Sequence, residues 1–240
     1  VGKNSKERMP WEVAKQAIDY VLEREEDFPE ESVVWDFIGG EPFLEIDLID
    51  KICDYIKVEQ FQRDHHWFGA YRFSFSTNGI NYHEEKEQQF ILKNKEHLSI
   101  GITIDGTEMK HDLNRVYKTS GRGSYKDVVR NIPLWLSQFP DASTKVTISS
   151  ADIPYIKESV LHLYALGIHE VNINCVFEDV WKAGDDRLFE EQLLMLADAI
   201  IDNGYYRDYS CSLFGEHLGK PLDCELQNQN WCGAGMMLAV

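Results

Sequence analysis

Short apolar runs alternate with longer amphipathic segments along this chain. Residues 33–38 (VVWDFI) are nearly all apolar, which is typical of a strand covered on both faces. The segment that begins at Pro10, "PWEVAKQAIDYVLERE", repeats apolar residues at helical spacing, and residues 44–57 do the same. Four further strands are predicted at "YRFSFSTNG", "HLSIGITIDG", "TKVTISS" and "EVNINCVF". Further helices are predicted at "HEEKEQQFILKNK", "SYKDVVRNIPLWLSQF", "IKESVLHLYALG" and "RLFEEQLLMLADAIIDNG".

The strict alternation of strand and helix predicts an α/β fold. Such an order implies right-handed βαβ crossovers and a parallel sheet. Five strands with a helix before the first would make most of a barrel, or an open doubly wound sheet. After Gly204 the pattern stops, and a segment rich in aromatic residues, cysteine and glycine follows. That segment looks like the beginning of a further element.

Charge and cysteine usage narrow the class of partners. The net charge of −17 argues against a nucleic-acid surface and against an anionic membrane, because both would repel the chain. The chain contains no apolar run near the length of a membrane span, and "VGKNSKERMPW" lacks the apolar core of a secretion signal. The five cysteines are irregularly spaced, which is not a disulfide framework and favours a reducing cytoplasm.

The predicted strand ends carry small and polar residues. In parallel α/β folds, ligand sites gather at the carboxyl ends of the strands. Those ends read Gly39-Gly40-Glu41-Pro42, Ser76-Thr77-Asn78-Gly79, Thr103-Ile104-Asp105-Gly106, Ser149-Ser150 and Asn174-Cys175-Val176. Each motif alone is more often a simple turn. Glycine lets the backbone approach a ligand and a carboxylate pairs with an ammonium, so we expect Glu41 to hold an amino group.

Together, "GGEP", "STNG" and "TIDG" at successive strand ends resemble the core of a radical S-adenosylmethionine (SAM) enzyme. The segments "IDGTEMKHDLNRVYKTSGRGSYKDVVRNI" and "NWCGAG" resemble the bacterial branch with a SPASM-type extension, which modifies peptides or proteins and includes maturases that form thioether crosslinks. The resemblance covers nearly the whole chain. It implies a partial (β/α)6 TIM-like barrel of the radical SAM type over 1–206. Residues 207–240 would be a linker and the truncated beginning of a SPASM/twitch-like iron–sulfur region.

The resemblance also implies roles for particular residues. The methionine amino group of SAM would be bound by Gly39, Gly40 and Glu41, with Pro42 making the turn rigid. Ser76, Asn78 and Thr103 would contact the ribose or carboxylate region of SAM. Arg115 would bind the SAM carboxylate, and Val176 would lie against the adenine. Cys232, together with Cys224, would bind an auxiliary iron–sulfur cluster.

The family's chemistry follows from the same resemblance. A reduced [4Fe–4S] cluster donates one electron to SAM, and the resulting 5′-deoxyadenosyl radical takes a hydrogen atom from a precursor peptide. The implied partners are that peptide and an electron donor such as a flavodoxin or ferredoxin. This step needs no general base, so none is assigned.

One departure from the family is plain. The CxxxCxxC loop that binds the catalytic cluster is absent from these 240 residues. Val1 begins about where that loop should have ended, so we expect a fragment of a longer protein. The chain as written would then have no radical activity by itself.

Several residues have simpler interpretations. Cys53 lies on an apolar helix stripe and is expected in the core, Cys175 is expected to pack at a strand end, and Cys211 has no predicted place. His65 and His66 are expected on a surface loop, because adjacent side chains diverge and no third metal ligand is near. Residues 23–31 are expected to be a solvated acidic helix end.

His111 is expected to make a local contact, and Asp105 to fix its loop through local amide bonds. Two other function classes stay open. One is an unrelated α/β-barrel enzyme in which Glu41 and Asp105 perform acid–base chemistry. The other is a non-catalytic module that binds a leader peptide.

Overall fold

The computed structural model describes residues 8–176 and 178–215. The chain divides into two compact units, and each is described by itself. Within the described residues, the first unit comprises 8–35 and 45–72, and the second comprises 36–44, 73–176 and 178–215. Among the described helices, none has both the length and the apolar character that crossing a bilayer requires.

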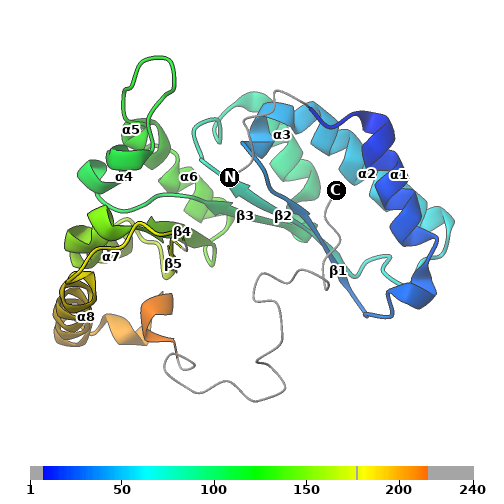
Figure 1. Cartoon of the computed structure of the whole chain (residues 1–240). Coiled ribbons are helices and arrows are strands. Elements are labelled where there is room, and N and C mark those ends of the chain that lie inside the picture. The colour runs from blue at the N-terminus through cyan, green and yellow to red at the C-terminus, as the bar shows by residue number, and fades with distance from the viewer. Residues whose placement is uncertain (1–7, 177, 216–240) are drawn as a thin grey trace. The chain divides into compact units, whose positions relative to one another are not determined.

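The first unit is built on two helices that lie side by side, α1 (Trp11–Leu22) and α2 (Ile46–Gln62) (Figure 1). Both confirm the predicted periodicity, and Pro10 precedes the first turn of α1. The Trp11 and Tyr55 rings meet edge to face, with centroids 5.3 Å apart. The buried stripes of the two helices are Ala14, Ile18, Val21 and Leu22 on α1, and Ile46, Ile49, Ile52, Cys53 and Ile56 on α2.

Six strands form two three-stranded sheets, in the orders β1-β2-β3 and β4-β5-β6. The strands are β1 (Val33–Phe37), β2 (Tyr71–Thr77), β3 (Leu98–Ile102), β4 (Ser143–Ile148), β5 (Glu170–Cys175) and β6 (Ser210–Cys211). The pairs β2–β3, β4–β5 and β5–β6 are parallel. A parallel bridge between Thr103 and Lys145 joins the end of β3 to β4. Strands therefore follow one another in chain order, as in the predicted partial barrel.

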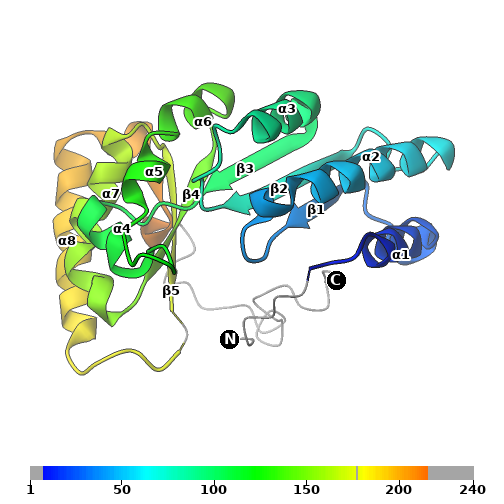
Figure 2. The same cartoon turned by 90° about the horizontal axis from the view of Figure 1, so that it is seen from above.

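The second unit contains the remaining helices. They are α3 (Glu85–Asn94), α4 (Glu108–Asn114), α5 (Tyr125–Val129), α6 (Ile132–Gln138), α7 (Ile156–Ala165) and α8 (Asp185–Asp202). Helices α4, α5, α7 and α8 all lie on one side of β4 and β5 (Figure 2). These helices form the outer layer of the partial barrel.

Three elements differ from the sequence prediction. The segment "SYKDVVRNIPLWLSQF" is two helices, α5 and α6, rather than one. At the break, the Asn131 side-chain amide donates to the carbonyls of Gly79 (2.7 Å) and Ile80 (3.1 Å), which fixes the chain direction between the helices. Helix α4 was not predicted. Strand β6 continues the sheet after Gly204, where the periodic pattern stops.

One face of the strands is apolar and the other is polar. The buried positions are Phe73, Phe75, Leu98, Ile100, Ile102, Val146 and Ile148, and the alternate positions are Ser74, Ser76, Ser99, Gly101, Thr103, Lys145 and Thr147. The prediction that residues 33–38 form a strand covered on both faces is wrong. Phe37 stacks on Phe75 at 4.8 Å, whereas Val34 is 60% exposed and Ile38 is 69% exposed. Apolar composition did not identify the single buried face, because both faces of this strand carry apolar residues.

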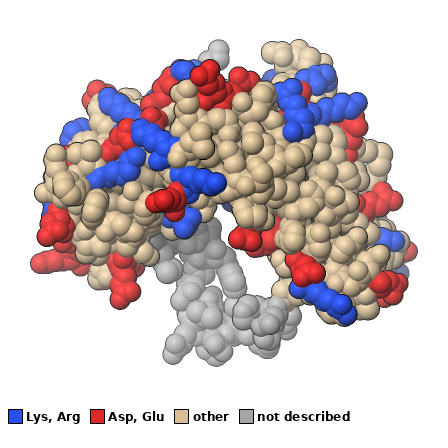
Figure 3. Space-filling model, turned by 180° about the vertical axis from the view of Figure 1, so that it is seen from behind, with Lys and Arg blue, Asp and Glu red and all other residues tan. Residues whose placement is uncertain are grey.

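The charged side chains are spread over the surface. On the face shown in Figure 3, lysine and arginine side chains are interspersed with aspartate and glutamate. The net charge of −17 is therefore not one continuous acidic field on this face.

Candidate functional site

Glu41 joins two of the predicted strand ends within the second unit. Its Oε1 accepts a hydrogen bond from the Thr77 hydroxyl at 2.6 Å, and its Oε2 accepts one from the Asn78 amide at 2.7 Å. Oε1 also accepts from the amide of Phe43 at 3.1 Å. The carboxylate thus ties the loop after β1 to the carboxyl end of β2. Thr77, which sequence reasoning missed, is 2% exposed and positions this carboxylate.

The three hydrogen bonds leave the Glu41 carboxylate able to accept one more. A carboxylate offers about four lone-pair positions. Two contacts fall on Oε1 and one on Oε2, so Oε2 retains one acceptor position. Glu41 therefore organises its loop and can still accept from a ligand ammonium.

The two glycines before Glu41 present open backbone. A Cβ added at Gly39 or Gly40 would meet nothing within 4 Å, although Gly39 has a φ of +148° that side chains rarely adopt. Gly106 is different, because a Cβ there would lie 2.2 Å from the Cβ of Ser159 on α7. The chain's own packing requires glycine at 106 but not at 40. Space beside Gly40 is what close approach of a ligand to backbone needs.

Asp105, which follows β3 in the chain, holds Arg115. The Asp105 side chain is buried, pairs with the Arg115 guanidinium and accepts from the Thr147 amide at 3.0 Å. Asp105 is therefore structural, as predicted, but its amide bond reaches β4 rather than its own loop. The Arg115 side chain is 31% exposed and directs only Nε and one terminal nitrogen to Asp105. Its other N–H donors can bind a ligand carboxylate.

A buried lysine connects the ends of β3 and β4. Lys110 is 2% exposed and donates to the Thr147 carbonyl at 2.6 Å. Its Nζ lies 3.9 Å from Oδ1 of Asp105 and 3.7 Å from Oδ1 of Asp152. Burial lowers the pKa of Lys110, and the two carboxylates oppose that shift.

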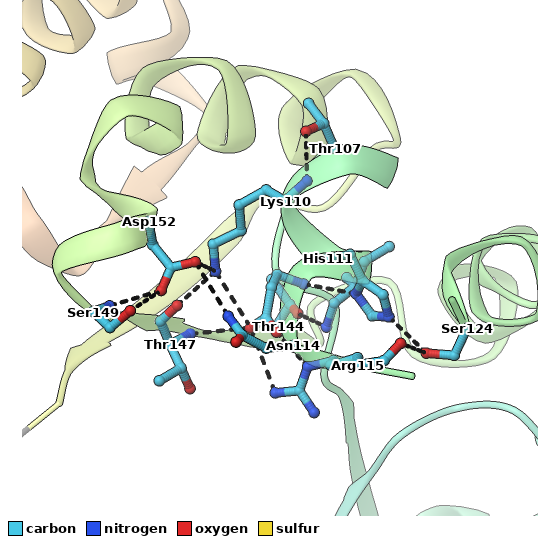
Figure 4. Close-up of polar contacts among 12 residues, drawn as sticks. Thr107, Lys110, His111, Asn114, Arg115, Ser124, Thr144, Thr147, Ser149 and Asp152 are labelled. Carbon is cyan, nitrogen blue, oxygen red and sulfur yellow. Dashed lines mark hydrogen bonds and ion pairs between the residues drawn. The ribbon is translucent and has the colours of Figure 1, made fainter. Parts of the chain in front are cut away.

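Asp152 completes this network from the next turn. It accepts from the amide of Ser149 at 2.8 Å and from the hydroxyl of Ser149 at 2.6 Å (Figure 4). The bond from the Ser149 amide, together with one from the Asp152 amide to the Ser149 side chain, forms a capping box. Sequence reasoning missed both Lys110 and Asp152. The Ser-x-x-Asp spacing at 149–152 was the available signal for Asp152, while nothing in the local pattern marks Lys110 as buried.

His111 makes local contacts, as predicted. The ring is fully buried, its Nδ1 accepts from the Asp105 amide at 3.2 Å, and its Nε2 lies 3.0 Å from the Ser124 hydroxyl. Burial lowers the pKa of His111 to about 4. The ring is therefore neutral at physiological pH and supports the loop that carries Asp105.

The other predicted SAM-binding residues lie at the same strand ends. Pro42 is buried and opens the turn Pro42–Glu45, and the Asn78 side chain accepts from the Ile80 amide at 2.9 Å. The Thr103 amide donates to Thr77, and the Val176 amide donates to Ile148. Their contacts with SAM stay predictions.

Lys145 is a residue that sequence reasoning missed. It lies on the polar face of β4, and its Nζ donates to the hydroxyl of Ser76 at 2.9 Å. Ser76 is thereby oriented by its neighbour across the sheet. This places a cation beside the predicted ribose or carboxylate region.

The cysteine predictions have mixed outcomes. Cys53 is 0% exposed, which confirms its place in the core, and Cys211 is 7% exposed. Cys175 is exposed, so the prediction that it packs is wrong; both of the last two residues of β5, Asn174 and Cys175, are exposed. Cys224 and Cys232 lie outside the described residues, and so does most of 207–240.

The prediction that His65 and His66 lie on a surface loop is confirmed for His66, which is exposed, and is wrong for His65. Their rings stack with centroids 4.6 Å apart, and His65 is 2% exposed rather than on the surface. Glu25 lies within reach of both rings. Adjacent residues in a tight turn do not alternate as they do in a strand, which is why their side chains converge.

Comparisons with known proteins give three findings. No family model matches the chain. An uncharacterized protein of Methanocaldococcus jannaschii is 30% identical over 175 residues, which are 72% of this chain and 54% of that protein. The chain therefore spans about half the length of this curated relative.

Solved structures of anSMEcpe, a radical SAM enzyme, resemble the chain. The structure of anSMEcpe with bound AdoMet has a TM-score of 0.71 at 19% identity and covers 92% of this chain and 61% of that one. The complex with AdoMet and the Cp18Cys peptide has a TM-score of 0.69 at 21% identity, over 92% and 61%. Identities this low show a shared fold. The predicted α/β fold, similar to that of a radical SAM enzyme, is confirmed.

Proposed function

We propose that the whole protein of which this chain forms part is a radical SAM enzyme that modifies a ribosomally made peptide, for example by thioether crosslinking. The observation that carries the proposal is the loop after β1. Open backbone at Gly39 and Gly40 adjoins a carboxylate with one acceptor position left. An ammonium beside accessible backbone is the ligand chemistry that this loop suits.

The residues present fit SAM. In the proposal, Glu41 accepts from the methionine ammonium, and Arg115, held by Asp105, binds the carboxylate with its remaining donors. Pro42 shapes the loop. Ser76, Asn78 and Thr103 contact the ribose or carboxylate region, and Val176 lies against adenine. When bound, SAM and a [4Fe–4S] cluster supply a 5′-deoxyadenosyl radical that abstracts hydrogen from the peptide.

A peptide substrate is supported by the neighbours and by the sheet. Two of the similar anSMEcpe structures contain a peptide, Kp18Cys or Cp18Cys, beside AdoMet. The polar face of β2 to β4 offers hydroxyl groups and Lys145 to a polar ligand. The proposal further includes an electron donor such as a flavodoxin or ferredoxin. It also includes auxiliary cluster ligands at Cys224 and Cys232 and a cytoplasmic location.

The acid–base alternative is disfavoured by the contacts of both carboxylates. Glu41 accepts three hydrogen bonds from its own chain, and Asp105 is committed to Arg115 and to the Thr147 amide. A general base must be free to take a proton from a substrate. Asp105 does not meet that requirement, and Glu41 has only one acceptor position left for it.

The test uses the complete native protein, reconstituted anaerobically with iron and sulfide and reduced with dithionite. After addition of SAM, 5′-deoxyadenosine is quantified by mass spectrometry. We expect Gly40→Ala to lower its formation at least tenfold, because the methyl group occupies the space beside the backbone. Leu44→Ala, which truncates a 68% exposed side chain close by in the same loop, is the matched control and should leave the rate unchanged.

Absence of SAM cleavage in a properly folded full-length protein would overturn the enzyme proposal. Peptide binding that is indifferent to SAM would then favour the leader-binding alternative. Equal losses of activity in Gly40→Ala and Leu44→Ala would indicate a folding defect. A loss in Gly40→Ala alone would indicate a ligand contact.

A further inference from the structure

Three side chains converge in the first unit, whereas the strand-end motifs belong to the second unit. Glu25 lies in the turn Glu25–Asp27 after α1, and His65 and His66 follow the end of α2. One ligand atom from each residue lies within 4.8 Å of the others. Oε1 of Glu25 is 3.4 Å from Nε2 of His65 and 3.9 Å from Nδ1 of His66.

The hydrogen bond of His66 fixes the position of its proton. Nε2 of His66 lies 3.1 Å from the Glu30 carbonyl, which can only accept, so Nε2 carries the hydrogen. In the neutral ring, Nδ1 then presents a lone pair toward the Glu25 carboxylate. Two electron-rich groups facing each other call for a cation between them.

His65 contributes a second, independent observation. Its side chain is 0% exposed, and its Nε2 has no hydrogen-bond partner among the described residues. A buried polar atom without such a partner requires an explanation, and an unplaced ion is one of the recognised explanations. That nitrogen is aimed at Glu25 and therefore into the cluster.

We propose that Glu25, His65 and His66 form a binding site for a divalent transition-metal ion of the zinc class. Imidazole nitrogen and carboxylate oxygen are zinc ligands, and three protein ligands leave a fourth position for water. Ligands at 2.0–2.2 Å in a tetrahedron lie about 3.4 Å apart. The separation of Glu25 and His65 already has that value, 3.4 Å.

Two local adjustments accompany binding. Nδ1 of His65 accepts from the Trp67 amide at 3.2 Å, so the ring proton moves from Nε2 to Nδ1 and this one neutral hydrogen bond is lost. The His66 ring, stacked on His65 with planes 19° apart, rotates so that Nδ1 points at the ion. Its side chain is 35% exposed, which leaves space for that rotation.

The test adds Zn²⁺ or Co²⁺ to the purified chain after chelator treatment and measures bound metal by equilibrium dialysis. Visible absorption of bound Co²⁺ distinguishes nitrogen and oxygen ligands from the cysteine thiolates of the same chain. We expect the wild-type chain to bind one ion. Glu25→Gln, His65→Gln and His66→Gln should each abolish this binding or weaken the affinity at least tenfold. His83→Gln is the matched control, since exposed His83 lies 3.4 Å from Glu84 and belongs to no such group among the described residues.

The readout stays informative if one variant folds poorly. His65 is buried, whereas Glu25 and His66 lie at the surface, so Glu25→Gln and His66→Gln test the site without opening the core. Zinc should also raise the thermal midpoint of the wild-type chain and leave that of His66→Gln unchanged. The proposal is overturned if the wild-type chain and the variant that combines all three substitutions bind equal amounts of metal. It is also overturned if NMR of the zinc-treated chain shows that Nδ1 of His66 carries a proton and no metal ion.

Discussion

Glu41 has two roles at the scale of the single residue. Its three hydrogen bonds hold the loop after β1, while its remaining acceptor position is offered to a ligand. Loss of activity in a Glu41 variant would therefore not distinguish a ligand contact from a misfolded loop. Gly40, beside open space, separates the two effects.

Glu41→Ala should lower the free energy of unfolding by about 2–3 kcal/mol, because charge-assisted hydrogen bonds to Thr77 and two amides are lost. Urea denaturation of the variant and of Leu44→Ala measures the difference. If the two variants unfold at the same urea concentration, Glu41 does not organise the loop.

His111 makes stability depend on pH. Its pKa is about 4 in the folded state, lowered by burial, against about 6.5 in an unfolded chain. The unfolded state therefore binds the extra proton first as the pH falls. Stability is complete above pH 6.5 and declines toward pH 4, with a loss of about 2 kcal/mol between pH 7 and pH 5.

The variant His111→Asn keeps an acceptor for the Asp105 amide but does not titrate. Chemical denaturation at pH 7 and pH 5 should show a smaller change in unfolding free energy for this variant than for wild type. Burial also lowers the pKa values of His65 and His162, so a shallow slope persists in the variant. Identical slopes would show that His111 is accessible to protons in the folded chain.

At the scale of the elements, the loop after β3 is fitted against α7. Gly106 has a φ of +124°, and a Cβ there would lie 2.2 Å from that of Ser159. We expect Gly106→Ala to cost about 3 kcal/mol of stability from backbone strain and overpacking. Gly40→Ala, with an ordinary φ and open surroundings, should cost less than about 0.5 kcal/mol.

Calorimetry on both glycine variants checks this contrast. The double variant Gly106→Ala/Ser159→Gly should recover part of the loss, because it removes the contacts with Cβ and Oγ of Ser159 and leaves the 2.9 Å contact with its Cα and the backbone strain. A stable Gly106→Ala would mean that the loop after β3 can move away from α7.

The helices were largely predictable where the periodic pattern of apolar residues extends over many positions. Helices α1, α2 and α7 are close to their predicted ranges because each buries a repeated stripe, and α8 is close to its range although Leu196 is its one buried residue. The break between α5 and α6 depends on bonds from Asn131 to a loop about 50 residues away, which no local pattern contains. The two residues of β6 are too short to carry a period.

The candidate site was predictable in outline only. Strand-end chemistry identified the loops, since the ends of parallel strands gather at one edge. The partners that position those loops were not identified, because Thr77 and Asp152 act through contacts with elements far away in the sequence, and nothing local marks Lys110 as buried. The burial of His65 and the approach of Glu25 to both rings were missed for the same reason, because Glu25 comes from another element.

At the scale of the molecule, the proposed SAM residues and the proposed metal cluster belong to different compact units. Gly39 to Pro42, Ser76, Asn78, Thr103, Arg115 and Val176 all fall in the second unit, and Glu25, His65 and His66 fall in the first. The two proposals can therefore fail independently. The division at residue 206 between barrel and iron–sulfur region stays a prediction.

The most direct test of the central claim is hydrogen exchange with and without SAM in the reconstituted whole protein. The amides of Gly39 and Gly40 make no hydrogen bond within the described residues, so they should exchange rapidly in the free protein. We expect SAM to slow exchange in residues 38–43 and 76–80 and to leave exchange in α3, at 85–94, unchanged. Protection confined to other segments, or none at a saturating SAM concentration, would contradict this expectation.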